Sequence, residues 1–165
     1  MAGKDVMQLE YAAEYALKVA GPSILEAIRF PFEKSRVAAH VVILDPRIPF
    51  EKRGSLPILA EQTFGEQDSL KWTSNFKAIA HSKAIICWRT GLSTRAVGEK
   101  APFLYEHGDT KYSGGVVCDG LIVAVSGMNW ELDEACAHMV IAFFWAHVRH
   151  GRDLIMQNRD QGFFE

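Results

Sequence analysis

Apolar residues recur at three- and four-residue steps near the start of the chain, which is the spacing of an amphipathic helix. The pattern covers residues 5–20, where alanine, leucine and valine occupy the repeated positions. Gly21 and Pro22 follow directly, and a proline inside a helix removes a backbone hydrogen bond. We therefore predict that this helix ends there and that Ser23 caps a second helix, which runs towards Phe30.

The next segments alternate between apolar and polar composition. Residues 38–44 are rich in β-branched and small apolar side chains, as in a buried strand, and they end at Asp45. Residues 46–67 hold three of the six prolines and two glycines. That composition predicts a loop, with one strand near residues 56–60.

A helix with an apolar stripe is predicted from Asp68 to a glycine stop at Gly91. Residues 95–112 have a mixed composition and predict a loop with a helical turn. Residues 113–137 then predict a short strand, a turn at Asp119-Gly120, a second strand, a break and an acidic helix start. Asp-Gly between two apolar runs is a strong hairpin signal, because a type I′ turn needs positive φ at both central positions.

The last long helix is predicted from about Asn129 to just before Gly151, with acidic residues in its first turn, where the helix dipole favours anions. Around Phe143 this helix is apolar on nearly all sides, so the domain or a partner subunit must cover it. Helices at both ends of the chain that flank a few strands predict an α+β fold.

Length, charge and cysteine content narrow the class of protein. A chain of 165 residues suits one domain. A net charge of −2 without a Lys/Arg stripe argues against nucleic acid as a partner. The longest apolar run, residues 139–146, is far shorter than the ~18 residues of a membrane span, and the N-terminus lacks an apolar signal core. Three cysteines without a CxxC motif predict buried thiols and a cytoplasmic location.

An ordered set of short motifs resembles the GlcG/HbpS family. From Lys83 to Ala96 the chain carries a Lys-Ala pair, then a Gly, then a Thr, at the family's spacing. Residues 41–45 match the family's first strand and its terminal Asp. The remaining motifs follow in the family's order: Gly114-Gly115, Asp119-Gly120, Val125-Ser126-Gly127 and Asp133-Glu134-Ala135. The resemblance covers residues 38–145.

This resemblance implies a profilin-like fold, in which helices cover both faces of an antiparallel sheet, and assembly into homo-oligomers. We expect a single GlcG/HbpS-like domain over residues 1–165, with an N-terminal helical extension of about residues 1–22. Some members of the family bind heme, so heme is the candidate cofactor. The family's heme contacts correspond here to Thr94 and to Gly114-Gly115.

The chemistry of these residues supports a small-molecule site. The amides of Gly114 and Gly115 could form an anion nest, or only a bulge that enters the strand. Lys83, Thr94 and Arg95 flank a helix end, where a cation and a hydroxyl could hold a carboxylate. Alternatively, Lys83 is a solvated helix residue and Thr94 caps the next turn. The leading hypothesis is a ligand-binding oligomer.

The alternative hypothesis is a small lyase, isomerase or hydrolase acting on an oxygenated or aromatic carboxylic acid. Lys83 or Arg95 would hold the carboxylate, and His107 or Asp45 would move the proton. A third hypothesis is a purely structural oligomer.

The other histidines favour structural roles. His147 and His150 are three residues apart, but no third metal ligand is spaced near them. His138 follows Glu134 by four residues, as in a helix pair. His40 and His81 could each serve as a heme ligand or a general base, although a hydrogen-bonded structural role is the simpler interpretation. We therefore predict no metal site.

Overall fold

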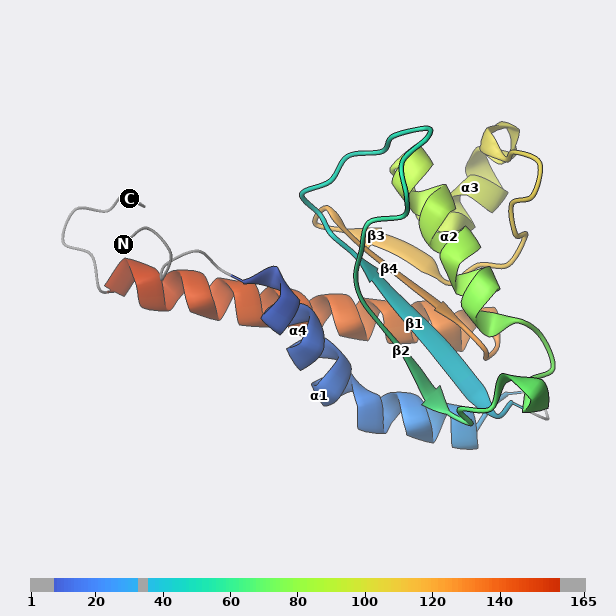
Figure 1. The fold of residues 1–165 in the computed structure, drawn as a ribbon, viewed down its shortest axis with the longest axis horizontal. Helices are drawn as coiled ribbons and strands as arrows, with labels where there is room; N and C mark the ends of the chain where they lie inside the picture. Colours follow the sequence, from blue (N-terminus) through green and yellow to red (C-terminus); the bar gives the residue numbers. More distant parts are fainter. Residues whose placement is uncertain (1–7, 33–35, 158–165) are drawn as a thin grey trace.

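A four-stranded antiparallel sheet lies between two helical layers (Figure 1). The computed structural model describes residues 8–32 and 36–157. The strands are β1 (Ala38–Leu44), β2 (Ile58–Gly65), β3 (Gly115–Cys118) and β4 (Leu121–Ser126). Their order across the sheet is β2-β1-β4-β3, and each neighbouring pair is antiparallel. This architecture confirms the predicted α+β fold with an antiparallel sheet.

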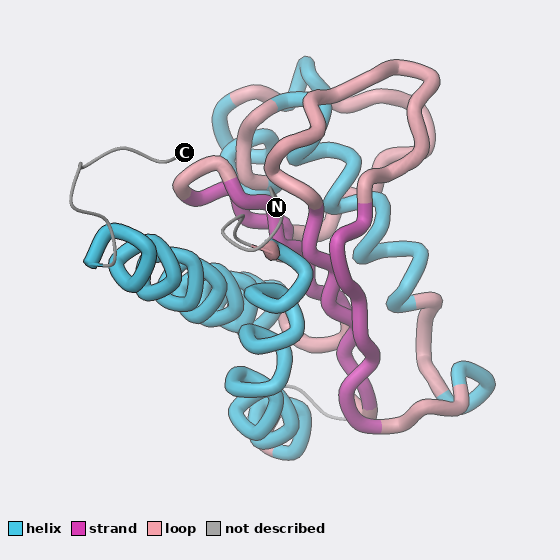
Figure 2. Tube along the Cα trace, turned by 60° about the vertical axis from the view of Figure 1, so that its left-hand side comes forward, coloured by secondary structure: helices cyan, strands magenta, loops and turns pink. Residues whose placement is uncertain are grey.

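The helices cover the two faces of the sheet separately, as Figure 2 shows. Helices α1 (Leu9–Arg29) and α4 (Trp130–Gln157) pack together on one face, and α2 (Phe76–Thr90) covers the other. A shorter helix, α3 (Thr94–Lys100), follows α2. Side chains of β1 alternate between these layers: Val41 and Ile43 join the α1/α4 core, whereas Val42 and Leu44 pack with α2.

Helix α1 corrects the prediction of a break after residue 20. It continues through Gly21 and Pro22 to Arg29 as one helix. The lost hydrogen bond is offset because a continuous stripe, including Ala20 and Ile24, is buried against the sheet and α4. Gly21 also has a packing role, since a Cβ there would lie 3.0 Å from the Phe64 ring. Residues 1–7 of the expected extension lie outside the described residues.

Three further boundaries differ from the predictions. Strand β2 is longer than the predicted strand near residues 56–60 and extends to Gly65, because it pairs along the whole of β1. Helix α2 begins at Phe76 rather than at Asp68, since the Asn75 side chain caps it and residues 69–71 form only a 3-10 turn. Helix α4 passes Gly151 and ends at Gln157.

Several local predictions are confirmed. Asp119 and Gly120 both have positive φ, at 49° and 78°, as the predicted hairpin turn requires. Gly91 ends α2 in a left-handed conformation. Phe144 of α4 is buried within the domain itself, which answers part of the question of what covers that apolar helix. Within residues 8–32 and 36–157, no helix is long and apolar enough to cross a membrane.

The three cysteines yield a labelling prediction. Cys87 and Cys136 are buried, and burial raises the pKa of their thiols to about 12 and about 11, respectively. Cys118 is half-buried at the end of β3. Only a thiolate is reactive, and the thiols of Cys87 and Cys136 are both buried and protonated at pH 8. We therefore expect the native protein at pH 8 to react with one equivalent of a thiol reagent. Cys118→Ser should remove that equivalent, whereas fast labelling of two or three thiols would contradict the prediction.

Candidate functional site

The glycine pair meets the first residue of α3, Thr94, just after the end of α2. The Thr94 hydroxyl accepts hydrogen bonds from the amides of Gly114 and Gly115, at 3.1 and 3.0 Å. It donates in turn to the Gly115 carbonyl at 3.2 Å. The predicted anion nest is therefore filled by the chain's own side chain, and Thr94 acts as a buried clamp on the entry to β3.

Lys83 lies beside this clamp in the interior, where its side chain is only 1% exposed. Its ammonium donates to the Val125 carbonyl at 2.7 Å and to a carboxylate oxygen of Asp133 at 3.0 Å. Burial lowers the pKa of Lys83 and raises the pKa of Asp133 to about 6, while their mutual attraction acts in the opposite direction. The other Asp133 oxygen accepts from the Met128 amide at 3.0 Å, so the pair joins α2, β4 and the start of α4.

A hollow of about 130 Å³ opens next to this pair. Its lining includes Lys83, Asp133 and Arg36, the last of which lies in the segment before β1. Among the described residues, Lys83 donates to two acceptors, and an ammonium group has three N–H donors.

A second hollow, of about 200 Å³, adjoins the first. The two share Tyr112, Ser113 and Trp130, and the second also contains Arg95 and Lys111. We call the two hollows together the ligand groove. Tyr112 and Trp130 are about half exposed where the hollows meet. The combined volume reaches the lower end of the roughly 300–1,000 Å³ typical of small-molecule pockets.

Arg95 lies on the wall of this groove and pairs with two carboxylates, closely with Glu134 and at 4.0 Å with Glu99. Its Nε donates to both oxygens of Glu134, at 3.1 and 3.0 Å. Of the five ligand residues chosen from the sequence, Lys83 and Arg95 line the groove, while Thr94, Gly114 and Gly115 form the structure behind it.

The two candidates for proton transfer in the enzyme hypothesis, His107 and Asp45, lie in different loops. His107 is exposed in the loop that leads towards β3. Asp45 follows β1, where Arg47 binds both of its carboxylate oxygens and lowers its pKa. Within the described residues, no hydrogen bond joins His107 to Asp45 or to the glycine pair.

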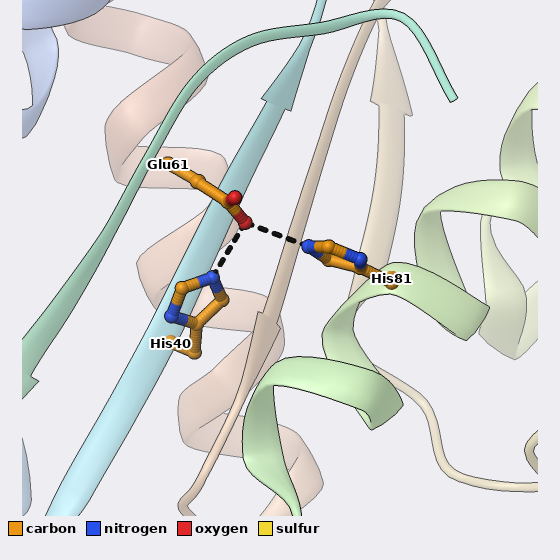
Figure 3. A group of neighbouring side chains, drawn as sticks. All are labelled: His40, Glu61 and His81. Atoms are coloured by element: carbon orange, nitrogen blue, oxygen red, sulfur yellow. Dashed lines mark hydrogen bonds and ion pairs between the residues drawn. The ribbon is translucent and has the colours of Figure 1, made fainter. Parts of the chain in front are cut away.

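A separate polar cluster, not expected from the sequence, lies beneath α2 (Figure 3). His40 of β1 and His81 of α2 each place Nε2 against the same oxygen of Glu61, from β2, at 2.8 and 2.6 Å. The other ring nitrogen of His40 lies 2.8 Å from the Thr63 hydroxyl. The ligand atoms of the two histidines and Glu61 all lie within 4.8 Å of one another.

The electrostatics of this cluster favour a neutral histidine beside an ionised carboxylate. Burial lowers the pKa of His40 despite the opposing effect of Glu61. Burial also acts to raise the pKa of Glu61, but the hydrogen bonds from His81 and His40 outweigh it and the pKa falls below its ordinary value.

The sequence did not indicate a role for Glu61, because this residue lies in the segment predicted as a loop. Strand pairing places Thr63 opposite His40 and Glu61 opposite Val42, on the face that α2 covers. The available signal was the polar alternation of Glu61 and Thr63 along an edge strand. The remaining candidate pair, His147 and His150, is on α4, where the ring of His147 packs 5.1 Å from that of Tyr15.

Comparisons with known proteins bear on the fold. No model of a known protein family matches the sequence, and no curated protein sequence matches it. Solved structures do match. The Klebsiella pneumoniae protein ORFY, described as DUF336, has a TM-score of 0.55 at 16% identity and covers 88% of this chain and 97% of its own. A double mutant of Streptomyces reticuli HbpS has a TM-score of 0.51 at 18% identity, over 86% of this chain and 89% of its own.

A heme complex is also among the similar structures. The PduOC:heme complex has a TM-score of 0.52 at 20% identity, over 81% of this chain and 92% of its own. Identities this low establish a common fold and leave the ligand to be argued from the residues. On that evidence, the chain has the fold of the GlcG/HbpS-like proteins, as its ordered motifs predicted.

Proposed function

We propose that this protein binds a planar small molecule with anionic groups in the ligand groove, with heme as the first candidate, and that it does so as a homo-oligomer. The observation that carries the proposal is the composition of the groove. Cationic side chains outnumber carboxylates in both hollows: Lys83 and Arg36 lie with Asp133 in one, and Arg95 and Lys111 lie with Glu99 in the other. Exposed aromatic rings lie where the hollows meet.

This arrangement suits a flat dianion. Carboxylates form strong charge-assisted hydrogen bonds with lysine and arginine. The faces of Tyr112 and Trp130 offer apolar surface to a conjugated ring, and aromatic pairs contribute about 0.5–1.5 kcal/mol beyond their buried area. Heme, which the PduOC complex contains, has both a planar macrocycle and carboxylates. In this chain Lys83, Arg36 and Arg95 would hold the carboxylates.

Assembly is supported by the outer surfaces of the long helices. Tyr11 and Tyr15 of α1 are exposed, as are Leu154 and Met156 of α4. The C-terminal half of α4 also projects beyond the sheet (Figure 1). Exposed apolar side chains that gather in one patch are typical of protein contact surfaces.

Hemin titration and native mass spectrometry test this proposal. We expect a saturable shift of the hemin Soret band, and native mass spectra of an oligomer that carries the ligand. Arg95→Gln should weaken binding about tenfold or more, since a hydrogen bond to a charged group contributes roughly 1.5–3 kcal/mol. Trp130→Ala should weaken it up to about tenfold, since an aromatic pair contributes roughly 0.5–1.5 kcal/mol beyond its buried area.

Arg149→Gln is the matched control. Arg149 is an exposed arginine paired with Asp119 at 3.1 Å, away from the groove, so its loss should leave hemin binding unchanged. The absence of a Soret shift would exclude heme. Equal weakening in the control and groove variants would show that binding occurs elsewhere, and a monomeric mass would contradict the oligomer.

A further inference from the structure

We propose that His40, Glu61 and His81 form a binding site for a divalent first-row transition-metal ion, with zinc as the best match. The ligands are the Nε2 atoms of both histidines and a carboxylate oxygen of Glu61 (Figure 3). This inference is independent of the ligand groove, because none of the three residues lines either hollow.

The donor set is the first argument. Two imidazoles and one carboxylate are a ligand set used by zinc enzymes, in which three protein ligands leave a fourth position open. Imidazole nitrogen disfavours magnesium and calcium, which prefer oxygen ligands.

The distances are the second argument. In the metal-free arrangement both Nε2 atoms bond to one Glu61 oxygen, at 2.8 and 2.6 Å. Tetrahedral zinc with bonds of about 2.0–2.2 Å holds its ligand atoms roughly 3.3 Å apart. The nitrogens therefore need to move about half an ångström or slightly more from the oxygen. Since all three ligand atoms lie within 4.8 Å of one another, the nitrogens also need to approach each other by at most about 1.5 Å, and side-chain rotations can supply both movements. The ion would lie among the three ligand atoms and replace the two hydrogen bonds.

The third argument is the support around the ligands. A metal-bound histidine normally donates its other ring N–H to a nearby acceptor, which fixes its tautomer and orientation. The Thr63 hydroxyl lies 2.8 Å from Nδ1 of His40 and can accept that proton. His40 is buried on a central strand, so it provides a rigid anchor.

Access is the fourth argument. The side chains of Glu61 and His81 are 27% and 28% exposed, so an ion can enter from solvent and still be largely enclosed. Lys77, one helical turn before His81, lies 3.7 Å from the other oxygen of Glu61. Its charge opposes a cation, but its side chain is 55% exposed and can turn outward when the ion binds.

Isothermal titration calorimetry of the full chain, stripped with a chelator, tests the site. At pH 7.5 we expect zinc chloride to bind with one ion per chain and magnesium chloride to give no binding. His81→Gln and Glu61→Gln should each weaken zinc binding by more than about 100-fold, because loss of even a supporting residue costs roughly 10–100-fold. Thr63→Val should weaken it about tenfold for that reason.

Two exposed histidines outside the cluster provide the control, since His107→Asn and His150→Gln should bind zinc as the unmodified protein does. Cobalt(II) gives an independent readout: visible d–d absorption of tetrahedral strength is expected in the unmodified protein and its loss in His81→Gln. Circular dichroism of each variant checks that the fold is retained.

Zinc binding of unchanged strength in His81→Gln would overturn the assignment, as would equal loss in the His107→Asn control. Failure of the unmodified protein to bind zinc or cobalt would show that the cluster is a hydrogen-bonded structural network only.

Discussion

Lys83→Met is expected to lower the free energy of unfolding by about 3–5 kcal/mol, the usual consequence of removing one partner from a buried ion pair. Lys83 donates to Asp133 and to the Val125 carbonyl, and both of these residues are buried. Methionine fills similar space but donates nothing, so a buried carboxylate would remain without its counter-charge. Urea denaturation, monitored by circular dichroism, measures the change.

The effect should depend on pH. Burial already raises the pKa of Asp133 to about 6, and loss of Lys83 raises it further. Between the unfolded pKa of 3.8 and the raised folded pKa, Asp133 is ionised in the unfolded chain and protonated in the folded one. Folding of the variant therefore takes up a proton in this pH range. Its stability should therefore fall as pH increases through this window, so that the loss is smaller at pH 5 than at pH 8.

Lys77→Met is the matched control on the same helix. Lys77 is exposed and its ion pair with Glu61 spans 3.7 Å, so its loss should change stability by no more than about 0.5 kcal/mol. Combining Lys83→Met with Asp133→Leu should recover much of the loss, because both charges are then gone. A Lys83→Met variant as stable as the control would show that the ammonium is dispensable.

Gly114→Ala is the second change with a large expected effect, again about 3–5 kcal/mol. Gly114 has a φ of 131°, a conformation that costs other residues roughly 1–3 kcal/mol. An added Cβ would lie 2.7 Å from the ammonium of Lys83 and from the Val125 carbonyl oxygen. Neither atom can move without breaking the ion pair or the sheet, and overpacking of this kind adds roughly 1–3 kcal/mol.

Gly91→Ala separates the two contributions. Gly91 also has positive φ, at 72°, but a Cβ there meets nothing within 4 Å. We expect only the conformational cost of about 1–2 kcal/mol. Thermal or urea denaturation of both variants measures the difference. Equal losses at the two positions would mean that the close approach at Gly114 relaxes without cost.

The sequence predicted those parts of the fold that depend on neighbouring residues. The Asp119-Gly120 turn needs only two residues that tolerate positive φ, and the Gly91 helix stop needs one. Residues 38–44 form β1 with the predicted bounds because both faces of this central strand are buried. The end of the first helix was predicted wrongly, since the local effect of Pro22 was outweighed by packing against distant residues.

The candidate sites depend more than these local elements do on contacts between residues that are far apart in the sequence. Lys83 and Arg95 were chosen from the sequence and line the groove, yet no local pattern indicated that Lys83 would be buried against Asp133, fifty positions away. The cluster of His40, Glu61 and His81 depends on the register between β1 and β2 and on the placement of α2 above them.

The chain's own pattern thus determined the class of fold, the order of most elements and the turns, because these follow from hydrophobic periodicity and backbone conformation over a few residues. Only the tertiary structure decided which polar side chains meet. These contacts depend on strand register and helix docking, which bring together residues far apart in the sequence, so no local pattern around one residue predicts its partner.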